Sequence, residues 1–308
     1  MWDVDTPALW TDEARGLVLV TAKGTHELKV FDGADGALIG SWGSEGTGPG
    51  EYQRPNGVLV VEDFALVVER DNRRIQVLHM PEGTSLGSFG EDVLEYPYGL
   101  AARGSAAELE LWVTDDYEYQ EDVVPDDLTR RVHRFTVTLR RDGPPEVLDH
   151  STFGAPDGDG ALRVVESIQI DPEHGVLFVA DESRRAYLRY GVEGSYQGER
   201  LGAGLIEGDP EGIVLVRCSD EGGYWIVTDQ QDDVSFFRVF GRTDLAYVGT
   251  FRGEITTNTD GTTFAHGPVP GFPEGVMYAI HDDQALAAFD WGEIARALGL
   301  SAGCGGRG

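Results

Sequence analysis

Short apolar runs alternate with turn-forming residues along most of the chain. Runs of about five to eight β-branched, aromatic or leucine residues, such as 17–21 and 224–228, are separated by clusters of Gly, Asp and Asn, a pattern typical of strands. Helical spacing of apolar residues is nearly absent. The exception is residues 291–300, an amphipathic segment that predicts one short helix near the C-terminus. The pattern predicts an all-β protein.

The strand-like runs fall into six sets, and each set opens in a similar way. The openings are near Pro7, Asn56, Tyr98, Glu166, Glu211 and Asp260. Their spacing is close to the roughly 40–50 residues of a four-stranded propeller blade. A two-sheet sandwich would also contain many short strands, but it would not repeat the same opening. We therefore predict an all-β, six-bladed β-propeller with four-stranded antiparallel blades around a central channel.

A single domain is expected, because no linker rich in Pro, Ser and Gly divides the chain. Residues 1–300 form the propeller in this prediction, and residues 301–308 form a flexible Gly-rich tail. The third set is longer than the others, because residues 117–131 form an insertion that is dense in Asp and Glu. Such an insertion predicts a solvated loop.

The chain is strongly acidic. Its 308 residues include 54 Asp and Glu against 24 Lys and Arg, which gives a net charge of −30. Such a surface repels nucleic acid and anionic lipid, so we expect neither as a partner. There is no run of about 18 apolar residues, which argues against a membrane span. The acidity could serve solubility or adaptation to salt, or it could create a demand for cations.

The two cysteines lie in different settings, Cys218 in a strand-like stretch and Cys304 in the Gly-rich tail. We therefore predict that they are not paired, which leaves the redox compartment open. Met1 leads into a polar segment without the apolar core of a signal peptide. The protein is then either cytoplasmic or the mature domain of an exported precursor. We expect the second, as a secreted or periplasmic monomer.

Several blades open or turn with a short acidic cluster, and some of these clusters contain glycine or proline. The clusters are at residues 5–7, 166–167, 181–182, 209–212, 260–261 and 282–283. The inner strands of a propeller all begin at the same end of the channel, so equivalent residues of different blades converge there. Ca²⁺ prefers six to eight oxygen ligands, which such a ring could supply. Turn chemistry is the alternative for each cluster taken alone.

Six clusters at matching positions favour a rim that binds divalent metal. No pair of histidines or cysteines has zinc-like spacing, so we expect no soft-metal site. Basic residues are scarce, yet Lys23 and Arg70 each follow a strand-like run. A cation beside a metal cluster is unfavourable unless an anion lies between them, as in a phosphate or carboxylate substrate. The alternative for each is a salt bridge to one of the many acids.

Several segments match, in order, the motifs of one known family. Residues 5–10, Asp-Thr-Pro-Ala-Leu-Trp, are similar to its opening Asp-Asp-Pro-Ala-Ile-Trp. Residues 209–213, Asp-Pro-Glu-Gly-Ile, are similar to Asp-Ile-Glu-Gly-Leu, and residues 291–295 to Trp-x-x-Ile-Ala. Further matches are at residues 28–32, 96–100, 166–182, 259–261 and 272–275. Most of the chain thus resembles the β-propeller phytases, which are calcium-dependent phosphatases of inositol phosphates.

The resemblance implies roles for individual residues. Those that match calcium ligands are Asp5, Glu166, Asp181, Glu182, Glu211, Gln230, Asp260 and Asp282. Those expected to bind phosphate or act in catalysis are Lys23, Arg70, Tyr98 and Glu211. Two basic residues that are usual in the family are absent from this chain. Asp115 and Asp116 stand where a lysine is usual, and the segment after Asn56 lacks an arginine. Asn258 and Ser167 replace the usual Asp and Gly.

The resemblance implies calcium-dependent hydrolysis of phosphate monoesters, with phytate as the leading substrate. Bound Ca²⁺ would neutralise phosphate oxygens and lower the pKa of an attacking water. The net charge of −30 would require the substrate to arrive as its calcium complex. Two other classes stay open: a metal-dependent lactonase or esterase on a six-bladed propeller, and a non-catalytic phytase-like module. The missing lysine and arginine favour the module.

Overall fold

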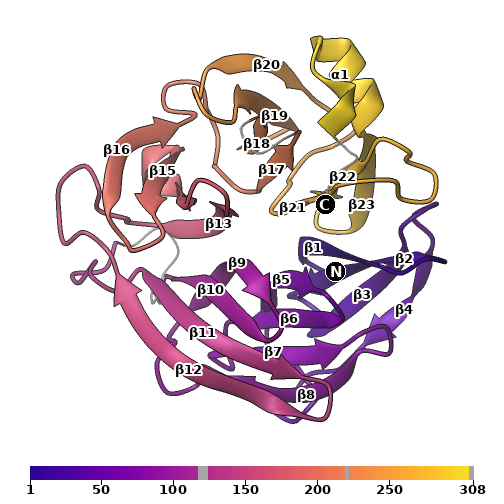
Figure 1. Ribbon diagram of the computed structural model, residues 1–308, viewed down its shortest axis with the longest axis vertical. Helices are drawn as coiled ribbons and strands as arrows, with labels where there is room; N and C mark the ends of the chain where they lie inside the picture. Colours follow the sequence, from indigo (N-terminus) through magenta and orange to yellow (C-terminus); the bar gives the residue numbers. More distant parts are fainter. Residues whose placement is uncertain (117–123, 219–221, 305–308) are drawn as a thin grey trace.

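The computed structural model describes residues 1–116, 124–218 and 222–304, and its strands form six antiparallel sheets arranged in a ring (Figure 1). The first three sheets contain β1 (Val4–Thr11), β2 (Gly16–Ala22), β3 (Glu27–Asp32), β4 (Leu38–Trp42), β5 (Pro55–Val61), β6 (Phe64–Glu69), β7 (Arg74–His79), β8 (Thr84–Phe89), β9 (Pro97–Ser105), β10 (Glu108–Asp115), β11 (Val132–Arg140) and β12 (Gly143–Phe153). The other three contain β13 (Val165–Asp171), β14 (Val176–Asp181), β15 (Ala186–Gly191), β16 (Tyr196–Leu201), β17 (Ile213–Arg217), β18 (Gly223–Gln231), β19 (Val234–Gly241), β20 (Tyr247–Phe251), β21 (Thr262–Ala265), β22 (Val276–His281) and β23 (Ala285–Asp290).

Each sheet is one blade built from consecutive strands, and the first strand of each blade lies nearest the centre (Figure 1). The prediction of a six-bladed β-propeller is therefore confirmed. One detail differs from the expectation of four strands in every blade. Among the described residues the sixth blade has three strands, β21 to β23. The C-terminal helix α1 (Trp291–Leu298) follows β23 at the point where a fourth strand would begin.

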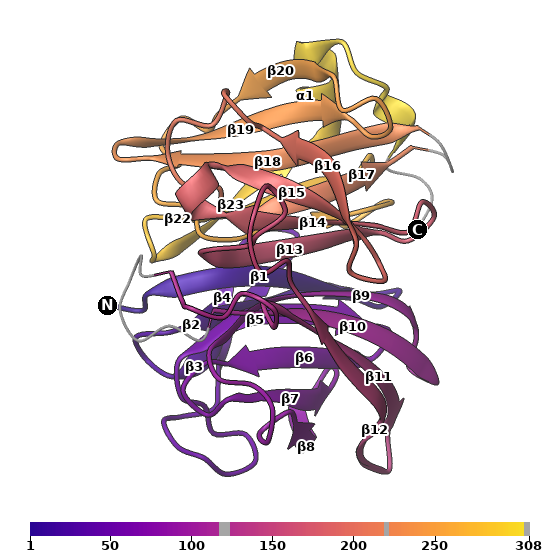
Figure 2. The same cartoon turned by 90° about the vertical axis from the view of Figure 1, so that its left-hand side faces the viewer.

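The ring closes between its first and last blades. The backbone N–H of Val4 in β1 donates to the carbonyl of Asp283, which follows β22, at 2.9 Å. The hydroxyl of Tyr278 in β22 donates to the carbonyl of Gly33, which follows β3, at 2.5 Å. Figure 2 shows the blades from the side, with the N-terminal half of the ring below the C-terminal half. These bonds join the two ends of the chain and complete the circle of blades.

Apolar side chains between neighbouring blades form the core. Phe89 of blade 2 packs edge-on against Phe135 of blade 3, with ring centroids 5.5 Å apart. Phe178 of blade 4 packs in the same way on Trp225 of blade 5, at 4.9 Å. Burial of apolar area contributes roughly 25 cal/mol per Å², and aromatic pairs add to it. The core thus lies between the blades, and the inner strands enclose a central cavity of about 440 Å³.

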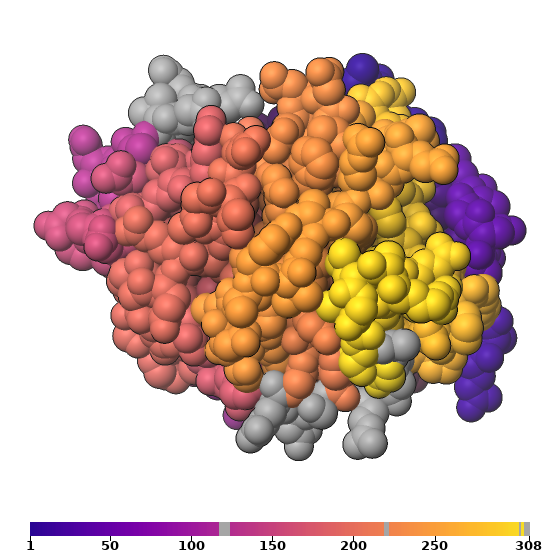
Figure 3. Space-filling model, turned by 90° about the horizontal axis from the view of Figure 1, so that it is seen from above, coloured from indigo at the N-terminus to yellow at the C-terminus, as the bar shows by residue number. Residues whose placement is uncertain are grey.

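Helix α1 begins and ends with ordinary capping groups. The Asp290 carboxylate accepts the backbone N–H of Glu293 at 3.0 Å, which satisfies a free N–H of the first turn. Gly299 follows the helix with φ of 69°, a left-handed conformation that favours glycine. Trp291 and Ile294 are buried against the fifth and sixth blades, and Figure 3 shows the yellow C-terminal part of the chain lying against orange parts. The helix predicted over residues 291–300 is confirmed, although it ends at Leu298.

Cys218 and Cys304 form a disulfide bond that spans 86 residues of sequence. The prediction that they are not paired was wrong. Cys218 directly follows β17, and Cys304 ends a 3₁₀ turn, Ala302–Cys304, after helix α1. The packing of α1 on the propeller brings the two cysteines together, which their sequence surroundings did not indicate. The tail predicted over 301–308 is therefore tied down at Cys304, and its residues 305–308 lie outside the described residues.

The acidic insertion predicted over residues 117–131 lies partly outside the described residues, which exclude 117–123. Its last residue, Arg131, is fully buried. The Arg131 guanidinium donates to the carbonyls of Asp115 at 3.0 Å and Arg163 at 2.7 Å. This end of the insertion is packed, because Arg131 links blade 3 to the segment that enters blade 4. Most of residues 124–130 are at least partly exposed, as predicted for a solvated loop. No helix in the described ranges is long and apolar enough to cross a membrane.

Candidate metal centre at one end of the channel

The register of the inner hairpins defines two rings of six equivalent residues. In each blade one residue of the first strand pairs with one of the second: Pro7 with Val20, Val58 with Val67, Leu100 with Val113, Ile168 with Val179, Ile213 with Val227, and Thr262 with Ala279. Two positions before each first partner stands the entry ring, which consists of Asp5, Asn56, Tyr98, Glu166, Glu211 and Asp260. Three positions after each second partner stands the exit ring, which consists of Lys23, Arg70, Asp116, Glu182, Gln230 and Asp282. Both rings lie at the same end of the channel.

Small residues after the entry ring let neighbouring inner strands approach closely. A Cβ atom added to Gly57 would lie 2.5 Å from the carbonyl oxygen of Tyr98 in the next blade. The same atom added to Gly261 would lie 2.5 Å from the carbonyl oxygen of Asp5. Such distances are too short for any side chain to be accommodated without movement. The glycines that follow entry-ring residues therefore allow this close approach, a role that turn chemistry alone did not suggest.

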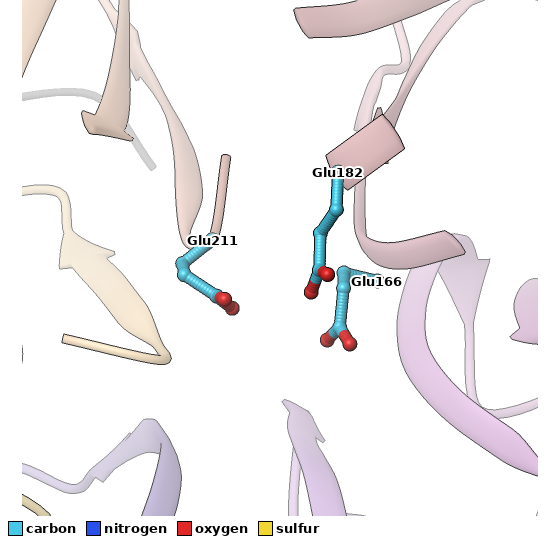
Figure 4. A group of neighbouring side chains, drawn as sticks. All are labelled: Glu166, Glu182 and Glu211. Carbon is cyan, nitrogen blue, oxygen red and sulfur yellow. The ribbon is translucent and has the colours of Figure 1, made fainter. Parts of the chain in front are cut away.

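Three glutamates of these rings converge on one point. Glu166 comes from the start of β13, Glu182 from the turn after β14, and Glu211 from the Pro-Glu-Gly segment before β17. One carboxylate oxygen from each lies within 4.8 Å of those of the other two, and Figure 4 shows the three side chains directed toward a common space. The hydroxyl of Thr114 donates to the carbonyl of Glu166 at 2.7 Å and so holds this segment against blade 3.

The charges of this cluster repel one another. Burial raises the pKa of the Glu166 carboxyl well above its usual range, and the negative charges of Glu211 and Glu182 raise it further. Burial also raises the pKa of Glu211, with Asp260 and Glu182 adding to the effect. Oxygen Oε2 of Glu166 is buried without a hydrogen-bond partner among the described residues. A hard divalent cation would offset the repulsion between the carboxylates and would give Oε2 of Glu166 a partner. The donor set therefore fits Ca²⁺.

Lys23 lies in a cage of aspartates beside the glutamates. Its Nζ is 2.8 Å from Asp260 Oδ2, 3.1 Å from Asp5 Oδ2 and 3.6 Å from Asp3 Oδ1. Burial alone would lower the pKa of this ammonium, but the charges of Asp5 and Asp260 outweigh burial and raise it. The Tyr98 hydroxyl completes the network by donating to Asp5 Oδ2 at 3.0 Å. The predicted salt-bridge alternative for Lys23 therefore describes the contacts that it makes here.

Arg70 makes local contacts instead of facing the glutamates. Its Nε is 2.8 Å from Asp71 Oδ1, and its guanidinium lies over the ring of Tyr96 at 5.0 Å. Gln230, predicted as a metal ligand, has a buried Oε1 without a hydrogen-bond partner among the described residues. Asp282 is exposed. Burial raises the pKa of the neighbouring Asp283, although the charge of Lys23 opposes this effect.

Asp181 has a structural role. Its carboxylate accepts the backbone N–H of Arg163 at 2.9 Å and the hydroxyl of Ser183 at 2.8 Å. The equivalent Asp115 accepts from the backbone of Glu95 and Tyr96, at 2.8 and 2.7 Å. In both blades the carboxylate at the end of the second strand fastens the loop that enters the blade. The structure thus separates Asp181 from the glutamates, and only its neighbour Glu182 joins them.

Asn56 was recognised as a blade opening but was not assigned to the site. It is almost fully buried, and neither its amide oxygen nor its amide nitrogen has a hydrogen-bond partner within the described part of the chain. Asp116 in the exit ring was likewise not assigned, and it pairs with Arg131. Both residues occupy the same place in their blades as the residues that were assigned, so alignment of the six repeats could have identified Asn56 and Asp116. Asp3 and Asp283 carry no such signal, because they lie outside both rings.

Comparison with known proteins shows the fold and no family. No protein-family model and no curated protein sequence matches the chain. Among solved structures, hydrazine synthase of Kuenenia stuttgartiensis is similar, with a TM-score of 0.58 over 98% of this chain and 81% of that chain. The sequences are 9% identical over the match, so the likeness is one of fold alone. The chain is a six-bladed β-propeller with an acidic cluster at one end of its channel.

Proposed function

We propose that the protein is a calcium-dependent hydrolase of phosphate monoesters, with phytate as its leading substrate. One observation carries the proposal: Glu166, Glu182 and Glu211 bring carboxylate oxygens within 4.8 Å of one another in a partly buried, mutually repelling cluster. Oxygen ligands of this kind suit Ca²⁺ better than softer metals. The order of sequence motifs shared with β-propeller phytases supports the choice of reaction.

The proposal gives the chain's residues distinct tasks. The three glutamates would hold the cation, and it would neutralise phosphate oxygens and lower the pKa of a water. Tyr98 would position Asp5, to which it donates a hydrogen bond at 3.0 Å. Lys23 would contact a phosphate oxygen once the charges of Asp5 and Asp260 are shared with a cation. The net charge of −30 favours a substrate that arrives as its calcium complex.

The test is release of inorganic phosphate from phytate and from a simple phosphomonoester, with millimolar Ca²⁺ and with EDTA. We expect release that depends on Ca²⁺ and is lost in Glu166→Gln. Glu173→Gln is a matched control, because Glu173 lies in the turn between β13 and β14, outside both rings, where it pairs with Arg217 and Arg242. Calcium-loaded protein that releases no phosphate from either substrate would overturn the proposal.

A second candidate rests on the state of the cations. The ammonium of Lys23 forms ion pairs with three aspartates, and the guanidinium of Arg70 pairs with Asp71. Both positive charges are therefore already neutralised by carboxylates and are not available to bind an anion. A metal-dependent lactonase or esterase needs no such cation. Hydrolysis of lactones or carboxylic esters without phosphate release would support that candidate. Calcium binding without any hydrolysis would support a non-catalytic module.

We also propose that the protein works outside the cytoplasm. The disulfide between Cys218 and Cys304 supports this, because disulfides persist mainly in oxidising compartments. Fractionation of cells that make the protein, with the thiols blocked at lysis, tests the point. Reduced protein confined to the cytoplasm would contradict it.

A further inference from the structure

A pair of histidines lies away from the acidic rings, on the outer part of blade 3. His133 belongs to β11 and His150 to β12, and the register places His150 opposite Phe135, two residues beyond His133. The two side chains therefore lie on the same face of the sheet. His133 Nδ1 and His150 Nε2 face each other at 3.1 Å. Their separation of 17 positions in sequence gave no zinc-like spacing, so only the pairing of the strands reveals them.

The surroundings hold the pair in place. The ring of His150 stacks on Phe135 with centroids 4.6 Å apart, and the His133 side chain is almost wholly buried. His133 Nε2 has no hydrogen bond among the described residues, but it lies 3.5 Å from Asp115 Oδ2. The carboxylate favours the proton on Nε2, which leaves the lone pair of Nδ1 directed at His150. A carboxylate behind a histidine is the arrangement that orients histidine ligands in many zinc sites.

The pair opens into a cavity that offers further oxygen donors. This cavity has a volume of about 450 Å³ and is also lined by Glu91, Asp92 and Thr152. Arg130 lines it too, but its guanidinium is engaged by Glu95 at 3.2 Å. A carboxylate and water can therefore complete the coordination of an ion held by two imidazoles.

We propose that His133 and His150 form a second metal site, which binds a borderline transition-metal ion such as Zn²⁺. Two nitrogen ligands of one tetrahedral Zn²⁺ lie about 3.3 Å apart, close to the separation of 3.1 Å observed here. Imidazole nitrogen suits Zn²⁺ and not Ca²⁺, so the site selects a different metal from the glutamate cluster. Binding moves the His150 proton from Nε2 to Nδ1, and no proton is released.

Both imidazoles are in the protonation state that a metal needs. Burial, together with the charges of His150 and Arg130, lowers the pKa of His133 to about 3. Burial also lowers the pKa of His150, although Asp149 opposes it. Neutral imidazoles are the ligand form, so protons do not compete with the metal near neutral pH.

Titration of the full chain with Zn²⁺, in the presence of saturating Ca²⁺, tests the site. We expect one Zn²⁺ per chain, and His150→Gln should bind it about tenfold more weakly or worse. His174→Gln is the matched control, because His174 is also partly exposed and contacts a carboxylate, Asp171 at 2.8 Å, without a second histidine. Glu211→Gln should leave Zn²⁺ affinity unchanged, which separates this site from the calcium proposal.

A second readout covers the case in which His150→Gln fails to fold. Cu²⁺ bound to the wild-type chain should show electron paramagnetic resonance couplings to two imidazole nitrogens. Equal Zn²⁺ affinity in wild type and His150→Gln would overturn the proposal. Copper without coupling to two imidazoles in the wild-type chain would overturn it as well.

Discussion

The Tyr98 hydroxyl donates to Asp5 Oδ2 at 3.0 Å, a contact that reaches from blade 3 to blade 1. Burial raises the pKa of this phenol well above its usual range, and the charge of Asp5 is the largest electrostatic contribution. Tyr98 therefore remains a neutral donor at any physiological pH. Asp5 is also 3.1 Å from Lys23 Nζ, so one carboxylate joins a phenol, an ammonium and the acidic rings.

Calcium should raise the stability of the protein. The glutamate cluster exists only in the folded chain, so a cation that it holds stabilises the native state by RT ln(1 + [L]/Kd), about 2.7 kcal/mol at a hundredfold excess over Kd. Thermal melts in millimolar Ca²⁺ should lie several degrees above melts in EDTA. Mg²⁺ at the same concentration controls for ionic strength. Identical melting temperatures in Ca²⁺ and in EDTA would contradict a calcium site at the glutamate cluster.

Glu211→Gln should weaken calcium binding at least tenfold, because the site loses one of three converging carboxylates. The same change should raise the melting temperature in EDTA, because burial and then repulsion from Asp260 and Glu182 disfavour the charged form of Glu211 and raise its pKa. Calorimetric titration and melts measure the two effects, with far-UV circular dichroism as the check on folding. Unchanged calcium affinity would mean that Pro210-Glu211-Gly212 is a turn and nothing more.

Lys23→Met should both destabilise the protein and impair catalysis. It leaves Asp5 and Asp260 buried without their cation, and breaking a buried pair typically costs about 3–5 kcal/mol. Calcium should recover part of this loss, since it can balance the same carboxylates. The kcat/KM for a phosphomonoester should fall about a hundredfold in excess calcium, as expected for a lost charge at the phosphate. A stable variant with full activity would exclude Lys23 from the site.

Asp260 should make the metal-free protein less stable as pH rises. Burial raises its folded-state pKa to about 7, despite Lys23, from a usual value of 3.8. The folded state therefore holds this proton more tightly than the unfolded chain, and the stabilisation is lost as pH rises from about 4 through 7. In EDTA, the stability of wild type should fall relative to Asp260→Asn over this range. A difference that does not change with pH would contradict the raised pKa.

Reduction of the disulfide should lower the melting temperature. The bond between Cys218 and Cys304 closes a loop of 86 residues, and such cross-links typically contribute about 2–4 kcal/mol. Cys304→Ser should show the same loss without reductant. The paired control is reductant added to Cys304→Ser, which should have no further effect. Calcium affinity should not change, because the bond lies outside both rings.

Much of the fold could be predicted from the sequence, because the information is repeated locally. Alternating apolar runs and turn residues recur once per blade, so the six sets, the blade openings and the short helix at Trp291 were all visible. Entry-ring residues such as Glu166 and Glu211 stood out for the same reason. Each occupies the same place in its own repeat, and a propeller must bring such places together.

Contacts between blades depended on tertiary structure alone. Asp181 and Glu182 are neighbours in an acidic pair, yet one fastens a loop and the other faces the glutamates, because successive residues after a strand point in different directions. The cage around Lys23 joins residues 237 positions apart, and the disulfide joins residues 86 positions apart. Local patterns determine which residues a blade presents. Closure of the ring decides which of them meet, because only closure sets the distances between charges and ligands on different blades.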